Sequence, residues 1–253
     1  MFFDESFTLF FLVLYLLLIV FSRSLYRLKP WKTTVTEPRI FELSSLHLLT
    51  TSVFAIVSSS SPSRALWHLH FGLKISYSFK GYYLIQAKYI FDLISRANLT
   101  DSKIVNTLTE LNTRLTPHDG EPFHDFTLYR HLVGSLIYLA VTQPNISYAV
   151  HQVSQFMAAP RSTHFSAVLR ILWYLKGTLF LGLCSSSPSL LQLDAYTDVD
   201  WAGDLTDRRS TTGYYFLLGT SLISWWSKKQ TVVAQSSTMA EYCALADTTS
   251  ELL

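Results

Sequence analysis

The chain has 253 residues, of which 49% are hydrophobic and 15% are charged. This composition suits one or two globular domains and excludes disorder over most of the length. The formal net charge of +2 does not by itself indicate a nucleic-acid-binding protein, because affinity for phosphate requires clustered lysine and arginine. The two cysteines, Cys184 and Cys243, are far apart and predict neither a disulfide framework nor a zinc knuckle.

The first element is an uncharged apolar run of fifteen residues, Phe7–Phe21, with basic residues after it. A helix that spans a bilayer needs about 20 apolar residues, so this run is intermediate between a core helix and a membrane span. The charges before it, Asp4 and Glu5, are acidic, unlike the basic start of a signal peptide. Membrane anchoring through residues 7–21 is therefore an open alternative, but a stray or out-of-frame segment is favoured.

The next part of the chain contains a low-complexity stretch, a predicted strand and helix, and a predicted loop. Ser58–Ser63 is a low-complexity stretch without core-forming residues. Residues 80–89 predict a turn, a strand and the start of a helix that ends near Asn98. The polar and turn-rich segment 103–124 predicts a loop or a linker between domains.

Three helices are predicted between residues 128 and 177. Leucines recur on one face of the first helix, and Pro144–Asn145 ends it and opens the second. Pro160 closes the second helix, Ser162–Thr163 is expected to cap the third, and Gly177 ends it. Because the apolar stripes and the stop signals agree, we expect these helices to form a core and to be the best ordered helical part of the chain.

The remaining residues predict strands followed by a helix. Ser185–Ser189 is expected to form a loop before the first strand. A cluster of serine and threonine from Ser236 is expected to start the helix. The extended apolar runs are Leu190–Tyr196, Gly213–Leu218, Ser221–Trp226 and Thr231–Ala234.

Two carboxylates stand at the ends of these elements. Asp198 follows the first strand, and Glu241 lies in the opening turn of the helix. Carboxylates in such positions can converge on one cation, as metal-assisted phosphodiester cleavage requires. Two structural explanations stay open: Asp198 and Asp200 can be solvated acids at a strand end, and Thr238–Glu241 can be a capping box.

Four words in this part of the chain resemble, in order, the ribonuclease H domain of a copia-type LTR-retrotransposon Pol polyprotein. The words are Thr197-Asp-Val-Asp-Trp-Ala-Gly-Asp204, Arg208-Arg-Ser-Thr-Thr-Gly-Tyr214, Ser224-Trp-Trp-Ser-Lys-Lys-Gln230 and Ser236-Ser-Thr-Met-Ala-Glu-Tyr242. The resemblance implies that Asp198 and Glu241 are the first two carboxylates of a Mg²⁺ site that hydrolyses the RNA strand of an RNA–DNA hybrid.

Basic residues flank the two carboxylates in sequence. They could steer a phosphate backbone toward the acidic pair, although basic residues in turns are equally well explained as solvated side chains. The candidates for binding nucleic acid are Arg208, Arg209, Lys228 and Lys229.

Earlier words resemble the reverse transcriptase of the same family. The word at Ser24–Lys29 resembles the palm, and those at Tyr129–Tyr138 and Tyr174–Thr178 resemble the thumb-to-connection region. The family's Tyr-Val-Asp-Asp word, whose aspartates hold the polymerase metals, does not occur in this sequence, so we expect no polymerase activity.

The resemblance therefore identifies the chain as a partial or decayed Pol fragment of mixed α/β (α+β) fold. We expect a degenerate N-terminal segment with an apolar run and palm remnant (1–65), a reverse transcriptase palm/thumb remnant and linker (66–126), a helical connection (127–183) and a truncated ribonuclease H-like domain (184–253). The sequence ends within the helix that carries Glu241, whereas the family continues to a third aspartate, so impaired nuclease activity is expected.

The implied partner is an RNA–DNA hybrid or another nucleic acid, with no small-molecule substrate and, by the resemblance, a cytoplasmic or nuclear location. Two alternatives stay open. One is a non-catalytic module that binds nucleic acid or protein through Trp201, Trp225 and Trp226 together with Arg208 and Lys228. The other is a small membrane-anchored protein built on residues 7–21.

Overall fold

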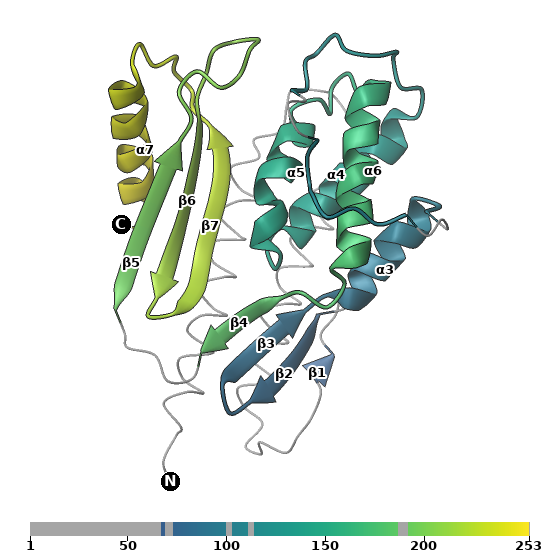
Figure 1. Ribbon diagram of the computed structural model, residues 1–253, viewed down its shortest axis with the longest axis vertical. Helices are drawn as coiled ribbons and strands as arrows, with labels where there is room; N and C mark the ends of the chain where they lie inside the picture. Colours follow the sequence, from purple (N-terminus) through teal and green to yellow (C-terminus); the bar gives the residue numbers. More distant parts are fainter. Residues whose placement is uncertain (1–66, 69–72, 100–102, 111–113, 187–191, 253) are drawn as a thin grey trace, which may run out of the picture.

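The computed structural model describes residues 67–68, 73–99, 103–110, 114–186 and 192–252, which form two antiparallel sheets and a layer of helices (Figure 1). The predicted apolar run 7–21, the palm word at 24–29 and the low-complexity stretch 58–63 lie outside the described residues. Among the described residues, no helix has the length and apolar character needed to cross a membrane.

The first sheet has the strand order β1-β2-β3-β4, and its last strand comes from far downstream in the chain. Gly81 begins β3 with φ of +140°, and a Cβ there would lie 2.0 Å from the backbone oxygen of Ser185, so only glycine fits this pairing. Ser185 was expected in a loop but lies in β4. The domain boundary predicted between residues 183 and 184 falls within this strand and stays a prediction. The strands are β1 (Trp67–His68), β2 (Lys74–Ser78), β3 (Gly81–Ile85) and β4 (Leu183–Ser186).

The helical layer confirms the three helices predicted from the apolar stripes. Pro144 stands at the start of the 3-10 turn η2, where its missing N–H costs nothing, and the chain continues directly into α5. Fully buried aliphatic side chains from four helices form one core between these helices, including Ile90, Leu132 and Leu172. The elements are α3 (Ala87–Arg96), α4 (Phe126–Leu139), η2 (Pro144–Ile146), α5 (Ser147–Ser154) and α6 (Ser162–Gly177).

The predicted cap of the third helix was wrong by one residue. The backbone N–H of Arg161, the N-cap of α6, donates to Nδ1 of His164 at 3.0 Å. The hydroxyl of Ser162 accepts from the N–H of Glu121 at 3.1 Å, and the hydroxyl of Thr163 donates to the backbone oxygen of Asp119 at 2.7 Å. These two hydroxyls hold the preceding loop against α6. Their partners are backbone groups of that loop, about forty residues earlier in the chain, which the local sequence pattern does not reveal.

The second sheet has the order β5-β6-β7 and is followed by α7 (Ser237–Leu252). The run Thr231–Ala234, expected to be extended, is not a strand. Gln230 explains the turn, because its backbone N–H donates to Ser210 O at 2.7 Å and its buried side-chain amide donates to Thr212 Oγ1 and to Ala240 O. The strands are β5 (Leu193–Val199), β6 (Thr211–Leu218) and β7 (Ser221–Lys229).

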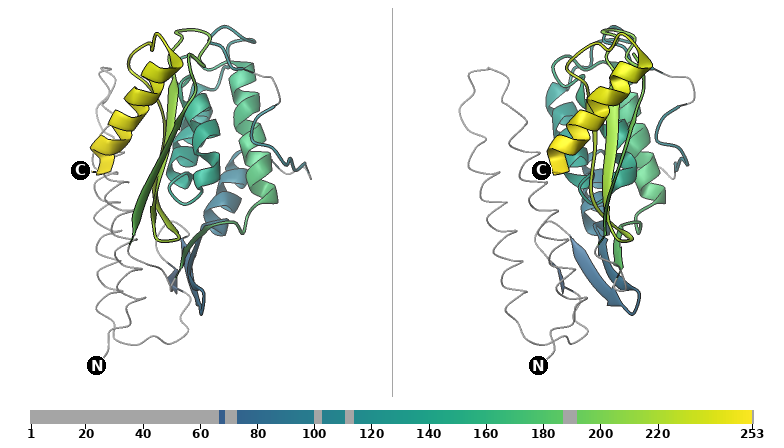
Figure 2. Two further views of the ribbon diagram at one scale, coloured as in Figure 1. Left: turned by 60° about the vertical axis from the view of Figure 1, so that its left-hand side comes forward. Right: turned by 90° about the vertical axis from the view of Figure 1, so that its left-hand side faces the viewer.

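Two different layers cover the second sheet. α7 lies on one face and packs against β5, whereas the helical layer lies on the other face, with α5 against β7 (Figures 1 and 2). Trp225 of β7 also joins the sheet to the end of α4, because its indole N–H donates to the backbone oxygen of Ala140 at 2.8 Å. A smaller apolar cluster joins the two sheets: Leu73, Ile75, Leu84, Leu183, Phe216, Leu218 and Ile223.

Candidate metal and nucleic-acid site

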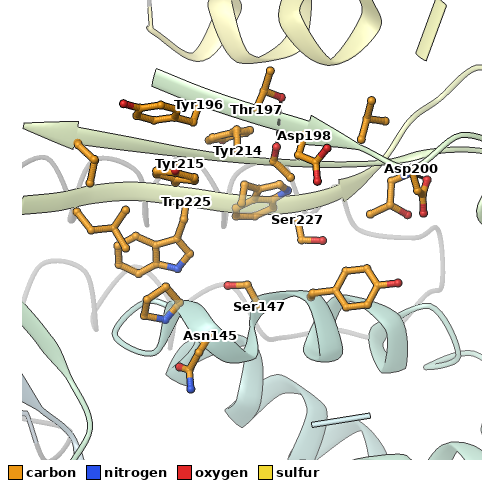
Figure 3. Close-up of a pocket in the computed structure, with 18 residues that line it drawn as sticks. Asn145, Ser147, Tyr196, Thr197, Asp198, Asp200, Tyr214, Tyr215, Trp225 and Ser227 are labelled. Carbon is orange, nitrogen blue, oxygen red and sulfur yellow. Dashed lines mark hydrogen bonds between the residues drawn. The ribbon is translucent and has the colours of Figure 1, made fainter. Parts of the chain in front are cut away.

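Asp198 lies near the end of β5, in register with Gly213 of β6, and its side chain is exposed. Side chains alternate along a strand, so Asp198 shares a face with Tyr196. Tyr196 stacks on Tyr215, and Tyr215 lies opposite Trp225, which reaches the helical layer. Asp198 therefore belongs to the face that is turned toward the helices, and it lines a pocket there (Figure 3).

Glu241 is the fifth residue of α7 and is also exposed. The hydroxyl of Ser236 caps this helix by accepting the N–H of Met239 at 3.2 Å. The capping-box explanation for Glu241 is therefore wrong, because the capping residue is Ser236 rather than Thr238. Small residues spaced four apart, Ala240 and Ala244, are buried and let the helix approach β5 closely.

The structure does not bring the two carboxylates together on one side of the sheet. Asp198 faces the helical layer, whereas Glu241 is carried by α7 on the opposite face. Their carboxylate oxygens suit Mg²⁺, but Mg²⁺ requires near-octahedral coordination by several oxygens. Within the described part of the chain, no three histidine, cysteine or acidic side chains are grouped so that they could hold a metal ion. The described residues thus do not fit a complete Mg²⁺ site, and the assignment of the pair stays a prediction.

Asp200 has a structural role. One of its carboxylate oxygens accepts the backbone N–H of Thr211 at 2.5 Å, which closes the loop between β5 and β6. The same loop places Gly203 beside the Asp200 carboxylate, where a Cβ would collide at 2.1 Å. Asp200 is therefore not only a solvated acid. Its hydrogen bond holds the loop that carries two of the candidate basic residues, Arg208 and Arg209.

Lys229 is committed to ion pairs. Its ammonium group lies within hydrogen-bond distance of Asp204, is 2.9 Å from Asp207 Oδ2 and donates to Gln155 of α5 at 3.3 Å. Burial lowers the pKa of Lys229, but the hydrogen bonds to the two carboxylates raise it more, and the net direction is upward. Burial likewise raises the pKa of Asp204, and the Lys229 ammonium reverses this to a net lowering. Lys229 therefore joins β7, the loop and the C-terminal end of α5, and its assignment to nucleic-acid binding stays a prediction.

The other three basic candidates differ in exposure. Arg209 is half-buried, and its Nε lies 3.8 Å from Asp207 Oδ2. Arg208 is exposed and adopts φ of +57°, and Lys228 is exposed on β7. Arg208 and Lys228 are therefore the two candidates whose positions suit contact with a nucleic-acid backbone.

Sequence reasoning missed two features where the helical layer meets the second sheet. His151 of α5 has its Nε2 buried without a hydrogen-bond partner among the described residues, and burial, with the Lys229 charge, lowers its pKa to about 4. The second feature is the pocket itself, with a volume of about 900 Å³, between the second sheet and the η2–α5 segment. The tyrosines of β5 and β6 are evident in the sequence, but their stacking depends on the pairing register of these two strands, which the sequence pattern does not determine.

Comparison with known proteins identifies relatives of the chain by sequence. The chain is 45% identical over 185 residues to the retrovirus-related Pol polyproteins from transposons RE2 and RE1 of Arabidopsis thaliana, which covers 73% of this chain and 13% of each polyprotein. It is 39% identical over 211 residues to the uncharacterized mitochondrial protein AtMg00810 of the same plant, covering 83% of this chain and 87% of that protein. No family model matches the chain, and no solved structure matches it.

Proposed function

Because the chain belongs to the family of copia-type retrotransposon Pol polyproteins, we propose that it is a retroelement-derived fragment whose C-terminal part binds RNA–DNA hybrids and cleaves them poorly. One observation carries the proposal. The β5-β6-β7-α7 unit contains all four words that resemble ribonuclease H, yet Asp198 and Glu241 lie toward different faces of its sheet.

Binding would use exposed basic and aromatic side chains of the second sheet and its loop. Arg208 and Lys228 are exposed, and Trp201 is 55% exposed while its indole N–H donates to Ala234 O at 3.2 Å. Lysine and arginine contacts to phosphate release counterions and give affinity without sequence preference. The shape of an A-form-like duplex and its 2′-hydroxyl groups would distinguish a hybrid from duplex DNA.

Poor cleavage follows from the arrangement of the carboxylates. Two-metal hydrolysis requires ions about 4 Å apart that clamp the attacking and leaving oxygens. Carboxylates directed to opposite faces of a sheet do not share an ion, and the described residues include no group of three histidine, cysteine or acidic side chains that could hold one. Polymerase activity is not part of the proposal, because the sequence has no paired aspartates in a Tyr-Val-Asp-Asp word.

Fluorescence anisotropy with a labelled RNA–DNA hybrid tests the binding. We expect Arg208→Gln and Lys228→Gln each to weaken binding and to reduce its salt dependence by about one counterion. Lys88→Gln, which removes an exposed charge from α3 in the helical layer, is the matched control and should bind as the wild type does. If all three variants lose affinity equally, the second sheet is not the binding surface.

A further inference from the structure

The pocket beside Asp198 has an aromatic wall that is open to solvent. Tyr196 of β5 and Tyr215 of β6 stack with ring centroids 5.0 Å apart, and Trp225 of β7 continues the same face. Tyr148 of α5 lines the pocket from the helical layer. Tyr196, Tyr215 and Tyr148 are 48%, 43% and 52% exposed. These rings form a preassembled surface on which a planar group can stack.

The charge of this pocket has one sign. Its lining residues include Asp198 and Asp200 and, within the described part of the chain, no lysine, arginine or histidine. Asp200 already accepts the N–H of Thr211, so Asp198 is the available carboxylate. Asp198 follows Tyr196 by two residues on the same face of β5, which places it about 7 Å along the aromatic wall.

A buried hydroxyl adds a second, independent feature. Ser227 lines the pocket from β7, and its Oγ has no hydrogen-bond partner among the described residues. An unpaired buried hydroxyl is costly unless a ligand or water supplies the missing hydrogen bond. The pocket therefore presents an aromatic surface and an anionic acceptor to one ligand, and the unsatisfied Ser227 hydroxyl is buried in its lining.

We propose that this pocket binds the guanidinium group of an arginine in a partner peptide. Guanidinium stacks on aromatic faces through cation–π attraction and donates in pairs to a carboxylate, which matches Tyr215 and Asp198. A nucleotide could stack its base here, but its phosphate would approach Asp198 and Asp200 without a cation among the described lining residues. The site uses neither a metal ion nor Arg208 or Lys228, so it does not depend on hybrid binding or cleavage.

The test compares a charged ligand with its neutral analogue on the full chain. N-acetyl-arginine amide and the citrulline analogue have nearly the same shape, and only the first is a cation. Quenching of tryptophan fluorescence should give affinity for the arginine ligand at least about tenfold higher than for the citrulline ligand. A short peptide with several arginines should bind at least about tenfold more tightly still, because neighbouring residues add contacts in a pocket of this size.

Matched variants locate the site. Asp198→Asn should weaken arginine binding about tenfold, whereas Asp194→Asn, which removes the same charge about 13 Å away on β5, should change it less than about twofold. Tyr215→Leu should weaken it about threefold or more, and Tyr242→Leu on α7 should leave it unchanged. Urea unfolding of each variant shows whether the fold is retained. If Tyr215→Leu does not fold, the comparison of Asp198→Asn with its control still tests the site.

Four results overturn the proposal. Equal affinity for arginine and citrulline excludes recognition of charge. Equal effects of Asp198→Asn and Asp194→Asn exclude this pocket. Tighter binding of adenosine monophosphate than of arginine assigns the pocket to nucleotides, and a peptide that binds no better than the single arginine excludes a peptide partner.

Discussion

Replacing His151 by leucine should make the protein lose less stability between about pH 7 and about pH 4. Burial, with the Lys229 charge, lowers the pKa of His151 from 6.5 to about 4, so the folded protein holds this imidazole neutral. The unfolded chain protonates it below about pH 6.5. Because the unfolded state then binds more protons, the free energy of unfolding falls as the pH drops through this window.

The magnitude follows from the size of the shift. Each pKa unit corresponds to about 1.4 kcal/mol, so a lowering from 6.5 to about 4 gives a loss of roughly 3 kcal/mol once the pH reaches about 4. The contribution is complete above about pH 6.5 and declines progressively below it. Leucine fills similar space and leaves no unpaired nitrogen, so the variant should match or exceed the wild type at low pH.

Urea unfolding followed by tryptophan fluorescence, from about pH 7 to about pH 4, measures the effect as the difference between wild type and His151→Leu. Taking this difference cancels the contributions of other titrating groups, including His164 and Asp204, whose pKa values are also lowered. His118→Leu is the matched control, because His118 is exposed. Parallel pH curves for wild type and His151→Leu, or an imidazole that titrates near its ordinary value in NMR spectra, would refute the reasoning.

Two further substitutions test the packing around the second sheet and the pairing in the first. Lys229→Met should lower the free energy of unfolding, measured with urea, by about 1–3 kcal/mol, because it leaves Asp204 and Asp207 without their shared cation. Lys228→Met is the control and should be nearly neutral. Equal effects of the two substitutions would exclude a structural role for Lys229. Gly81→Ala should lower the melting temperature because its Cβ would meet the β4 backbone, whereas Gly134→Ala, in open space on α4, should raise stability by up to about 1 kcal/mol; a neutral Gly81→Ala would contradict the β3–β4 pairing.

The sequence predicted the elements that depend on local periodicity. Apolar stripes and the stops at Pro144 and Pro160 were sufficient for the three central helices, and the tyrosine- and leucine-rich runs were sufficient for β5, β6 and β7. Thr231–Ala234 was predicted wrongly, because the two hydrogen bonds of the Gln230 side chain turn the chain there.

Features that depend on contacts between residues distant in the chain could not be predicted from the sequence. β4 pairs with β3 from about a hundred residues away, and neither strand's pattern identifies the other. The candidate carboxylates were located correctly on β5 and α7, but the face that each one occupies depends on the register and on which side α7 packs. Lys229 was one of four candidates for binding nucleic acid, and its acidic partners in the loop at 204–207 became visible only in the structure.

The central claim, that this chain belongs to the Pol family but cleaves hybrids poorly, is tested most directly by incubating the full chain with an end-labelled RNA–DNA hybrid in Mg²⁺ and in Mn²⁺. The account predicts retention of the hybrid with little RNA cleavage, and no difference in cleavage between wild type, Asp198→Asn and Glu241→Gln. Robust cleavage by the wild type that both substitutions abolish would contradict it, because the two carboxylates would then act on one metal site.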